Sequence, residues 1–251
     1  MSPLHALTIF VVGILAGAVN TIVGSGTLLT FPLLLGFGYA PVLANVSNTI
    51  GLVPGSAAGA IGYRRELRGQ GGRLRRLAGA SVLGGCLGAA LLLIVPGSAF
   101  AVIVIVFIVI AVIAVVAEPV LSRVLAGHRP KAQELPGPVA AAVVFIAGVY
   151  GGYFGAAQGI LVLAVLSLAL DDDLQRLNAL KVVLVGLVNL VAGIVFICVA
   201  QVAWGPTGLI AAGSLIGGTI GARAGRRLPI SVLRAAVVIV GIVAIIRLVG
   251  S

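Results

Sequence analysis

The sequence predicts an all-α polytopic membrane protein with about 8–10 membrane helices. Of its 251 residues, 61% are hydrophobic and only 9% are charged, too few for the polar shell of a soluble domain of this length. Long apolar runs recur along the whole chain, as membrane-spanning helices require. The high glycine count of 36 is typical of helices that pack closely in a membrane.

Ten apolar segments divide the chain, and short polar or basic stretches separate them. The segments are 5–23, 27–38, 43–63, 77–95, 99–122, 138–155, 158–170, 177–200, 207–224 and 229–249. The connections after the third, fifth and ninth segments are basic, whereas VPGS (95–98) and QVAWGP (201–206) contain no Lys or Arg. This alternation indicates how the chain is oriented, because positively charged loops stay on the cytoplasmic side of a membrane.

The orientation that best fits the charges places the N-terminus outside and lets all ten segments cross. All but Arg247 of the 16 basic residues then lie on the inner side. These inner residues are Arg64, Arg65, Arg68, Arg73, Arg75, Arg76, Arg123, Arg129, Lys131, Arg176, Lys181, Arg223, Arg226, Arg227 and Arg234. Both termini lie outside in this arrangement. The net charge of +10 is therefore interpreted as contact with the lipid bilayer, and no nucleic-acid partner is expected.

The segments form two halves of five around a central linker. Residues 1–125 are the predicted first repeat, 126–137 a cytoplasmic linker and 138–251 the second repeat. Because each half has an odd number of crossings, the second repeat is inverted relative to the first. AGAVNTIVGSGTLL (16–29) aligns with AGVYGGYFGAAQGI (147–160), and ANVSN (44–48) aligns with LNALK (177–181). Such repeats occur in secondary transporters, although glycine-rich membrane helices also align through composition alone.

Each half contains a segment shorter than the hydrocarbon core, and whether these two segments cross fully or re-enter is left open. Segments 27–38 and 158–170 reach only about 20 Å as helices, against a hydrocarbon core of about 30 Å. Each follows a longer helix through a glycine-rich turn, so each half should contain a broken hairpin whose turn lies at mid-membrane. The short helices should begin near Gly26 and Ala157. Helix N-termini carry free N–H groups and partial positive charge, which suits an anion.

The polar residues around these turns are the predicted substrate site. Hydroxyls and amides at the turns add donors, and Asn20 lines the first turn from the preceding helix. Helical spacing places Asn45, Asn48 and Thr49 on one face, and Asn178 and Lys181 on another. Lys181 either supplies a cation for the anion or snorkels to the inner surface; the hydroxyls could also serve only as contacts between helices. The candidate residues are Asn20, Gly24, Ser25, Gly26, Thr27, Asn45, Asn48, Thr49, Gln158, Asn178 and Lys181.

Four stretches carry a resemblance to a known family. They are GAVNTIVGSGTLLTFPLLL, PVLANVSNTIGLVPGSAAGAIGYRREL, VYGGYFGAAQGILVL and LNALKVVL. In this order they resemble the TauE/SafE family of sulfite and organosulfonate exporters. The resemblance implies an inner-membrane carrier of small sulfur-containing anions such as sulfite or sulfoacetate. The chain has GSG where the family often has three glycines, and GAAQG where GAGxG is common, which adds a hydroxyl and an amide at the predicted site.

The expected function is a secondary transporter, not an enzyme, that exports a small anion by alternating access around a midplane site. The alternative is an intramembrane enzyme or carrier for a lipid precursor, in which DDD (171–173) would bind a metal. That acidic run stands alone and begins a helix, where acids stabilise the dipole. The sequence therefore predicts no metal and no cofactor. A homodimer is left open. Without carboxylates at the centres of the predicted spans, membrane potential is the expected driving force.

Overall fold

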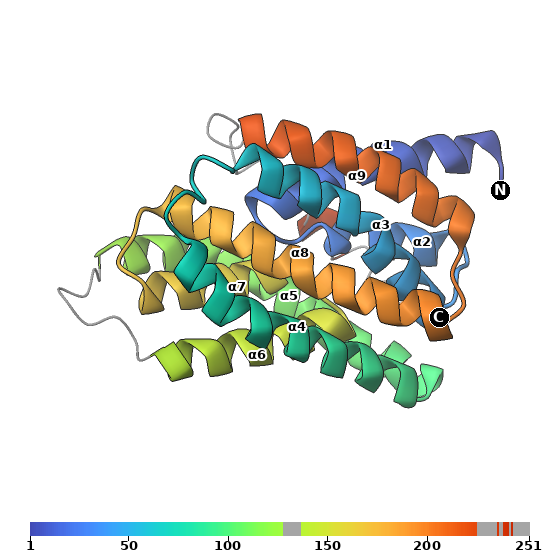
Figure 1. Cartoon of the computed structure of the whole chain (residues 1–251). Coiled ribbons are helices and arrows are strands. Elements are labelled where there is room, and N and C mark those ends of the chain that lie inside the picture. The colour runs from blue at the N-terminus through green and yellow to red at the C-terminus, as the bar shows by residue number, and fades with distance from the viewer. Residues whose placement is uncertain (128–136, 225–234, 236–237, 241, 243–251) are drawn as a thin grey trace.

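The protein is a bundle of helices that lie side by side in this computed structural model (Figure 1). The structure describes residues 1–127, 137–224, 235, 238–240 and 242. Within these residues there are nine helices and no strand, so the predicted all-α class is confirmed. The helices are α1 (Pro3–Ile22), α2 (Thr27–Gly36), α3 (Pro41–Gly62), α4 (Gly71–Ile94), α5 (Gly97–Gly127), α6 (Gly137–Tyr153), α7 (Gln158–Ala169), α8 (Leu174–Val199) and α9 (Trp204–Ala224).

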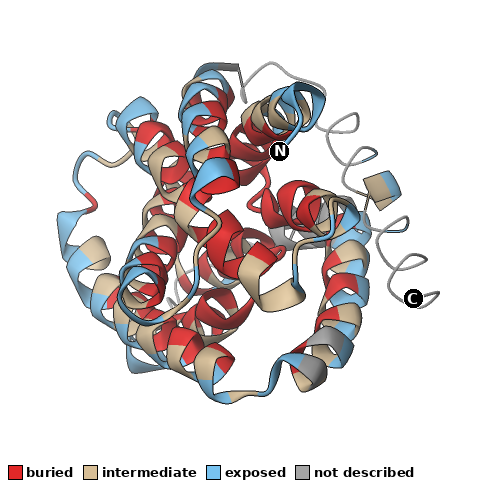
Figure 2. Ribbon diagram, turned by 90° about the vertical axis from the view of Figure 1, so that its right-hand side faces the viewer, coloured by how far each residue is buried: buried red, intermediate tan, exposed pale blue. Residues whose placement is uncertain are grey.

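The outer surface of the bundle is apolar. Three helices of the described chain, α1, α4 and α8, are long and apolar enough to cross a membrane by length and composition. On α4 the side chains of Leu83, Leu87 and Leu91 recur every four residues and are exposed, so one face of this helix is suited to lipid. Figure 2 shows buried residues inside the bundle and exposed ones around it. The chain is therefore a polytopic membrane protein.

The helices follow the predicted segments closely, with one difference at the basic stretch. α2 and α7 contain 10 and 12 residues, as short as predicted. α4 begins at Gly71, before its predicted start, so Arg73, Arg75 and Arg76 belong to its first turns and not to a loop. Arginine is a good helix former, which allows the helix to extend beyond the apolar run. The linker residues 128–136 and most of the tenth segment lie outside the described residues.

Helices from the two halves pack against each other in matching pairs. α1 packs against α9, and α6 packs against α4. α3 packs against α9, and α8 against α4, while α3 and α8 contact each other. Exchanging the two halves leaves this set of contacts unchanged. The inverted repeat itself stays a prediction, because the tenth segment is largely outside the described chain.

Glycines allow these paired helices to approach closely. A Cβ on Gly217 of α9 would overlap the carbonyl oxygen of Ile14 on α1, and a Cβ on Gly88 of α4 would overlap that of Val149 on α6. Close backbone approach through small residues is the usual mode of helix association in membranes. The high glycine content therefore reflects packing between the halves.

Asp172 joins the two halves at one end of the bundle. Its carboxylate accepts hydrogen bonds from Arg73 Nη1 at 2.5 Å and from Arg176 Nε at 2.8 Å. Gln70 Nε2 also donates to the carbonyl of Arg176 at 3.0 Å. The start of α4 and the start of α8 thus lie on the same side of the molecule, as the charge pattern predicts. Asp173 caps α8 by accepting a hydrogen bond from the N–H of Gln175 at 2.9 Å.

The environment of Asp172 lowers the pKa of its carboxyl group. Burial raises this pKa, but hydrogen bonds from the Asp173 N–H, Arg176 and Arg73 outweigh burial. The net pKa lies below the ordinary value. A lowered pKa in the folded state means that the contribution to stability is present above the unfolded pKa of about 3.9 and disappears as the pH falls through the folded value.

Replacing Asp172 should therefore weaken the junction between the halves in a pH-dependent way. We expect Asp172→Asn to lower the free energy of unfolding at pH 7 by about 1 kcal/mol or less, because the ion pairs are partly exposed. Thermal unfolding of the purified protein in detergent measures this difference. The difference between the variant and the wild type should shrink as the pH falls below about 4. A difference of constant size down to that pH would contradict the assignment.

Candidate functional site

The two broken hairpins share the same backbone geometry at their turns. Gly24 follows α1 with a φ of 85°, and Gly155 follows α6 with a φ of 77°. Each glycine N–H donates to the carbonyl five residues earlier, that of Val19 at 3.0 Å and that of Tyr150 at 3.1 Å. Glycine adopts this left-handed conformation without strain. The alignment of Gly24 with Gly155 in the sequence thus corresponds to equivalent turns in the structure.

The two turns are in direct backbone contact, and we call this contact the crossing. The N–H of Gly159, in the first turn of α7, donates to the carbonyl of Gly24 at 3.1 Å. A Cβ on Gly24 would overlap Gly159 Cα, and a Cβ on Gly159 would overlap Gly24 Cα. The space beside Gly24 Cα is therefore filled by protein. Residue 24 must be glycine for the two turns to meet, whereas the sequence suggested that this glycine lets a ligand approach.

The backbone N–H groups at the start of α7 are already engaged. Those of Gln158, Gly159 and Ile160 donate to the carbonyls of Gly155, Gly24 and Ala157, at 3.3, 3.1 and 3.0 Å. The expectation that this helix offers free backbone donors is wrong for these three groups. The turn is tight, with Ala157 at a φ of 58°. The carbonyls of Gly155 and Ala157 therefore lie close enough to accept hydrogen bonds from the first turn of α7.

The start of α2 is different. The N–H groups of Leu28 and Leu29 donate to local carbonyls, but the N–H groups of Ser25, Gly26 and Thr27 have no acceptor within the described chain. All three residues are buried. Consecutive free N–H groups at a helix start form a concave site for an anion. The N–H groups of Ala156 and Ala157, which align with Ser25 and Gly26, likewise have no acceptor within the described chain. Both turns therefore have open backbone donors, and the first turn has one more, the N–H of Thr27.

Lys181 lies beneath the crossing and is fully buried. Its Nζ donates to the carbonyls of Thr21 at 3.2 Å and Ile22 at 3.4 Å, which belong to the last turn of α1. A cation at a helix C-terminus is favourable. Its Cδ would lie 3.1 Å from a Cβ on Gly159, which places its stem against α7. The interpretation that Lys181 snorkels to the inner surface is wrong, because its ammonium group is bound inside the protein. Two of its three N–H donors are used in these hydrogen bonds, which leaves one for a ligand.

Two predicted asparagines form contacts between helices of the first half. Asn48 Nδ2 donates to Thr27 Oγ1 at 3.2 Å, and its Oδ1 accepts from the hydroxyl of Thr30. Asn20 Nδ2 donates to Ser56 Oγ at 3.3 Å. These side chains hold α2 and α1 against α3. Thr30 and Ser56 were missed at the sequence level, although Thr30 follows Thr27 at the spacing of one helical face.

Asn45 reaches the second turn from the other half. Its Nδ2 donates to the carbonyl of Tyr153 at 2.9 Å, in the last turn of α6. Thr49 and Asn178 are buried on α3 and α8, one helical turn from Asn45 and Lys181 respectively. Each of these residues lies on a helix that borders the crossing.

Several buried oxygen atoms in this region have no hydrogen-bond partner, which is costly unless a ligand supplies one. Ser25 Oγ is such an atom, and Ser25 has no exposed surface. The predicted residues with unpartnered oxygens are Ser25, Asn45, Gln158 and Asn178, and Tyr153 joins them. A serine hydroxyl donates to an anion directly, and an amide does so after a flip of its side chain. Tyr153 was missed because tyrosine in an apolar helix resembles ordinary core.

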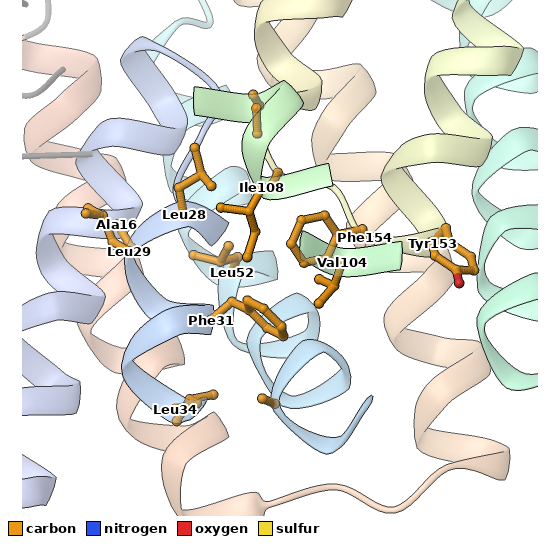
Figure 3. Close-up of a cluster of buried hydrophobic side chains, with 14 of the residues drawn as sticks. Ala16, Leu28, Leu29, Phe31, Leu34, Leu52, Val104, Ile108, Tyr153 and Phe154 are labelled. Carbon is orange, nitrogen blue, oxygen red and sulfur yellow. The ribbon is translucent and has the colours of Figure 1, made fainter. Parts of the chain in front are cut away.

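An apolar wall borders the crossing (Figure 3). Phe31 of α2 and Phe154 of the second turn meet edge to face, with ring centroids 5.1 Å apart. Phe107 of α5 lies against Phe154 at 6.2 Å. Figure 3 shows Val104 of α5 beside the same ring. The polar groups therefore lie next to a dry layer that separates them from one side.

The acidic run DDD has structural partners. Asp172 binds two arginines and Asp173 caps α8. In the part of the chain that the structure describes, no group of three His, Cys, Asp or Glu side chains could hold a metal ion.

An apolar helical bundle with two broken helices that meet around buried polar groups is the architecture of a membrane transport protein. The model of the family described as "Sulfite exporter TauE/SafE" matches residues 9–248. The chain belongs to this family, and the resemblance inferred from the four sequence stretches is confirmed. No curated protein and no solved structure shows significant similarity to the chain. Membership supports a role in transport and points away from an enzyme.

The crossing gives a direct test in a pair of glycines. Gly24 and Gly38 both have positive φ, at 85° and 84°, but a Cβ on Gly38 has open space around it. We expect Gly38→Ala to cost about 1 kcal/mol of stability through backbone strain alone. Gly24→Ala should cost clearly more, because its Cβ also overlaps Gly159. Thermal unfolding in detergent compares the two variants, and equal losses would argue against the crossing.

Proposed function

We propose that the protein is a secondary transporter that exports a small sulfur-containing anion, sulfite or an organosulfonate, by alternating access around the crossing. The observation that carries the proposal is the set of free, buried donors at the first turn. The N–H groups of residues 25–27 and the hydroxyl of Ser25 lack partners within the described chain. The ammonium group of Lys181 binds the carbonyl of Ile22, three residues before Ser25. This set suits an oxyanion.

We assign direct contact with the anion to Ser25, Gly26, Thr27 and Lys181, and a further contact to Gln158 in the first turn of α7, whose side-chain oxygen has no partner. Asn178, with its unpartnered oxygen, is a further contact on the same face of α8 as Lys181. Asn20, Asn45 and Asn48 hold the hairpins in place through the hydrogen bonds described above. The two halves would then move as inverted repeats around a fixed site.

The proposed location is the bacterial cytoplasmic membrane, with both termini outside. The support is the distribution of arginines, which favours the cytoplasmic side for the start of α4 and the start of α8. Arg73 and Arg176 do lie together on Asp172. The enzyme alternative loses its main support, since two of the three aspartates it needs already have protein partners.

The proposal is tested by binding. An anion that binds the folded protein raises its unfolding temperature in proportion to affinity and concentration. We expect sulfite or a sulfonate, but not a neutral analogue, to stabilise the purified protein among sulfite, sulfonates, thiosulfate, sulfate and carboxylates. Stabilisation by none of these, together with stabilisation by a lipid precursor, would favour the alternative function.

Two buried serines provide a matched control for the site. Ser25 and Ser214 have no exposed surface, but only Ser214 has a partner, the carbonyl of Gly51 at 2.7 Å. Ser25→Ala should leave the stability of the free protein unchanged and weaken anion binding roughly tenfold, because a hydrogen bond to a charged group is lost. Ser214→Ala should lower stability by about 0.6 kcal/mol and leave binding unchanged. Equal effects of both substitutions on binding would contradict the assignment.

Transport should respond to membrane potential. No Asp or Glu is buried among the residues whose side chains the structure describes, so these residues offer no internal carboxylate to carry a coupled proton. An anion that leaves an inside-negative cell moves down the potential. We expect efflux of labelled substrate from proteoliposomes to accelerate when the interior is made negative with a potassium gradient and valinomycin. Protein-free liposomes are the control, and a rate independent of potential would refute the proposed coupling.

A further inference from the structure

We infer that the site selects its ligand by charge, that it takes a monoanion in preference to a dianion, and that Lys181 sets this preference. This inference rests on the proposed function. It concerns which charge state of a tetrahedral oxyanion the crossing accepts. Lys181 is the one charged side chain among the buried residues that the structure describes.

The two halves of the protein perform the same structural task with different side chains. Lys181, on α8, donates to the carbonyl of Ile22 at the end of α1. Asn45, on α3, donates to the carbonyl of Tyr153 at the end of α6. Ile22 and Tyr153 occupy the same position in the aligned stretches 16–29 and 147–160. Each half therefore caps the broken helix of the other.

This correspondence separates capping from charge. A neutral amide is sufficient to cap α6 in one half, so the cap does not require an ammonium group in the other. The contacts of Lys181 within the described chain include no carboxylate. Its two hydrogen bonds go to backbone carbonyls, and its stem lies against Gly159 of α7. The positive charge is thus an addition to the structural task.

No carboxylate among the buried residues that the structure describes balances that charge. The acid nearest in sequence, Asp173, caps the start of α8, and Asp172 beside it is already paired with Arg73 and Arg176. These two residues lie eight and nine positions before Lys181, which is more than two helical turns. An isolated charge inside a membrane protein is costly. A ligand with one negative charge neutralises it, whereas a ligand with two leaves an excess negative charge buried in the same place.

The chemistry of the ligand follows from this balance. Organosulfonates and hydrogen sulfite carry one negative charge, and sulfate and fully ionised sulfite carry two. The free N–H groups at residues 25–27 bind the oxygen atoms of either kind, so they do not distinguish between them. The net charge of the bound complex does. Sulfite would accordingly bind in its singly protonated form.

Two probes of the same shape test the inference on the purified full-length protein in detergent. Methanesulfonate is a monoanion throughout the neutral range, and methylphosphonate changes from a monoanion to a dianion between mildly acidic and mildly alkaline pH. Titration calorimetry at both pH values measures their affinities. We expect methylphosphonate to lose about tenfold or more in affinity relative to methanesulfonate between the acidic and the alkaline pH. Methanesulfonate serves as the control for any effect of pH on the protein.

The variants assign the preference to its residue. Lys181→Gln keeps a donor for the α1 carbonyls, as Asn45 does for α6, but removes the charge. We expect it to bind methanesulfonate about tenfold more weakly and to lose the pH-dependent discrimination against methylphosphonate. Lys181→Arg keeps the charge and should keep the discrimination, which provides a second test if the glutamine variant does not fold.

The outcomes separate this inference from the proposed function. If the wild type binds methanesulfonate and binds the phosphonate dianion as tightly as the monoanion, the charge inference is overturned and the proposed function stands. Discrimination that survives in Lys181→Gln also overturns it. If the wild type binds no probe at either pH and no anion of the wider panel stabilises it, the proposed function fails and the charge inference fails with it.

Discussion

The backbone contact between Gly24 and Gly159 is the constraint on which the centre of this protein depends. The chain turns back inside the bundle in two places, after α1 and after α6. The peptide groups of both turns need hydrogen-bond partners within the protein, because lipid offers none. The turns solve part of this problem with each other, through the bond from the Gly159 N–H to the Gly24 carbonyl. Such an approach is possible only where neither residue has a Cβ. The short helices α2 and α7 begin at this contact, and their positions follow from it.

The remaining carbonyls at the ends of the broken helices are satisfied from the opposite half. Lys181 and Asn45 extend from α8 and α3 to the last turns of α1 and α6. Because each cap crosses from one half to the other, a movement of the halves relative to each other must either carry the caps along or exchange their partners. The hydrogen bonds of Asn48 to Thr27 and Thr30 instead stay within the first half. The polar residues therefore divide into those that hold a hairpin together and those that connect the halves.

The two surroundings of the crossing differ in character. The aromatic rings of Phe31, Phe107 and Phe154 form a dry layer, whereas Asp172 with Arg73 and Arg176 forms a charged junction at the end of the bundle. Both join elements from different halves. Ion pairs that are partly exposed contribute little stability. The charged junction therefore holds the two halves together less strongly than the aromatic layer does.

The sequence alone determined the class, the segments and the family. Composition is decisive because a chain with few charges must place its apolar surface in lipid, and the shortness of segments 27–38 and 158–170 requires turns inside the membrane. The same reasoning named Ser25, Gln158 and Lys181, since polar groups stand out in apolar runs. It could not distinguish the two turns: their glycines match, yet the N–H of Thr27 has no acceptor within the described chain, whereas that of its counterpart Gln158 donates to the carbonyl of Gly155.

Tertiary structure decided what the sequence could not, because hydrogen-bond partners in this protein come from distant segments. The spacing of Lys181 in the sequence is equally compatible with a position at the surface, and only the packing of α1 against α8 shows that its ammonium group binds the carbonyls of Thr21 and Ile22. Gly24 was expected to admit a ligand, and the approach of Gly159 fills that space instead. The spacing of residues along the sequence shows only which face of its own helix a side chain occupies. Which atoms lie opposite depends on how the halves pack, and that packing is set by the combined contacts of all the helices.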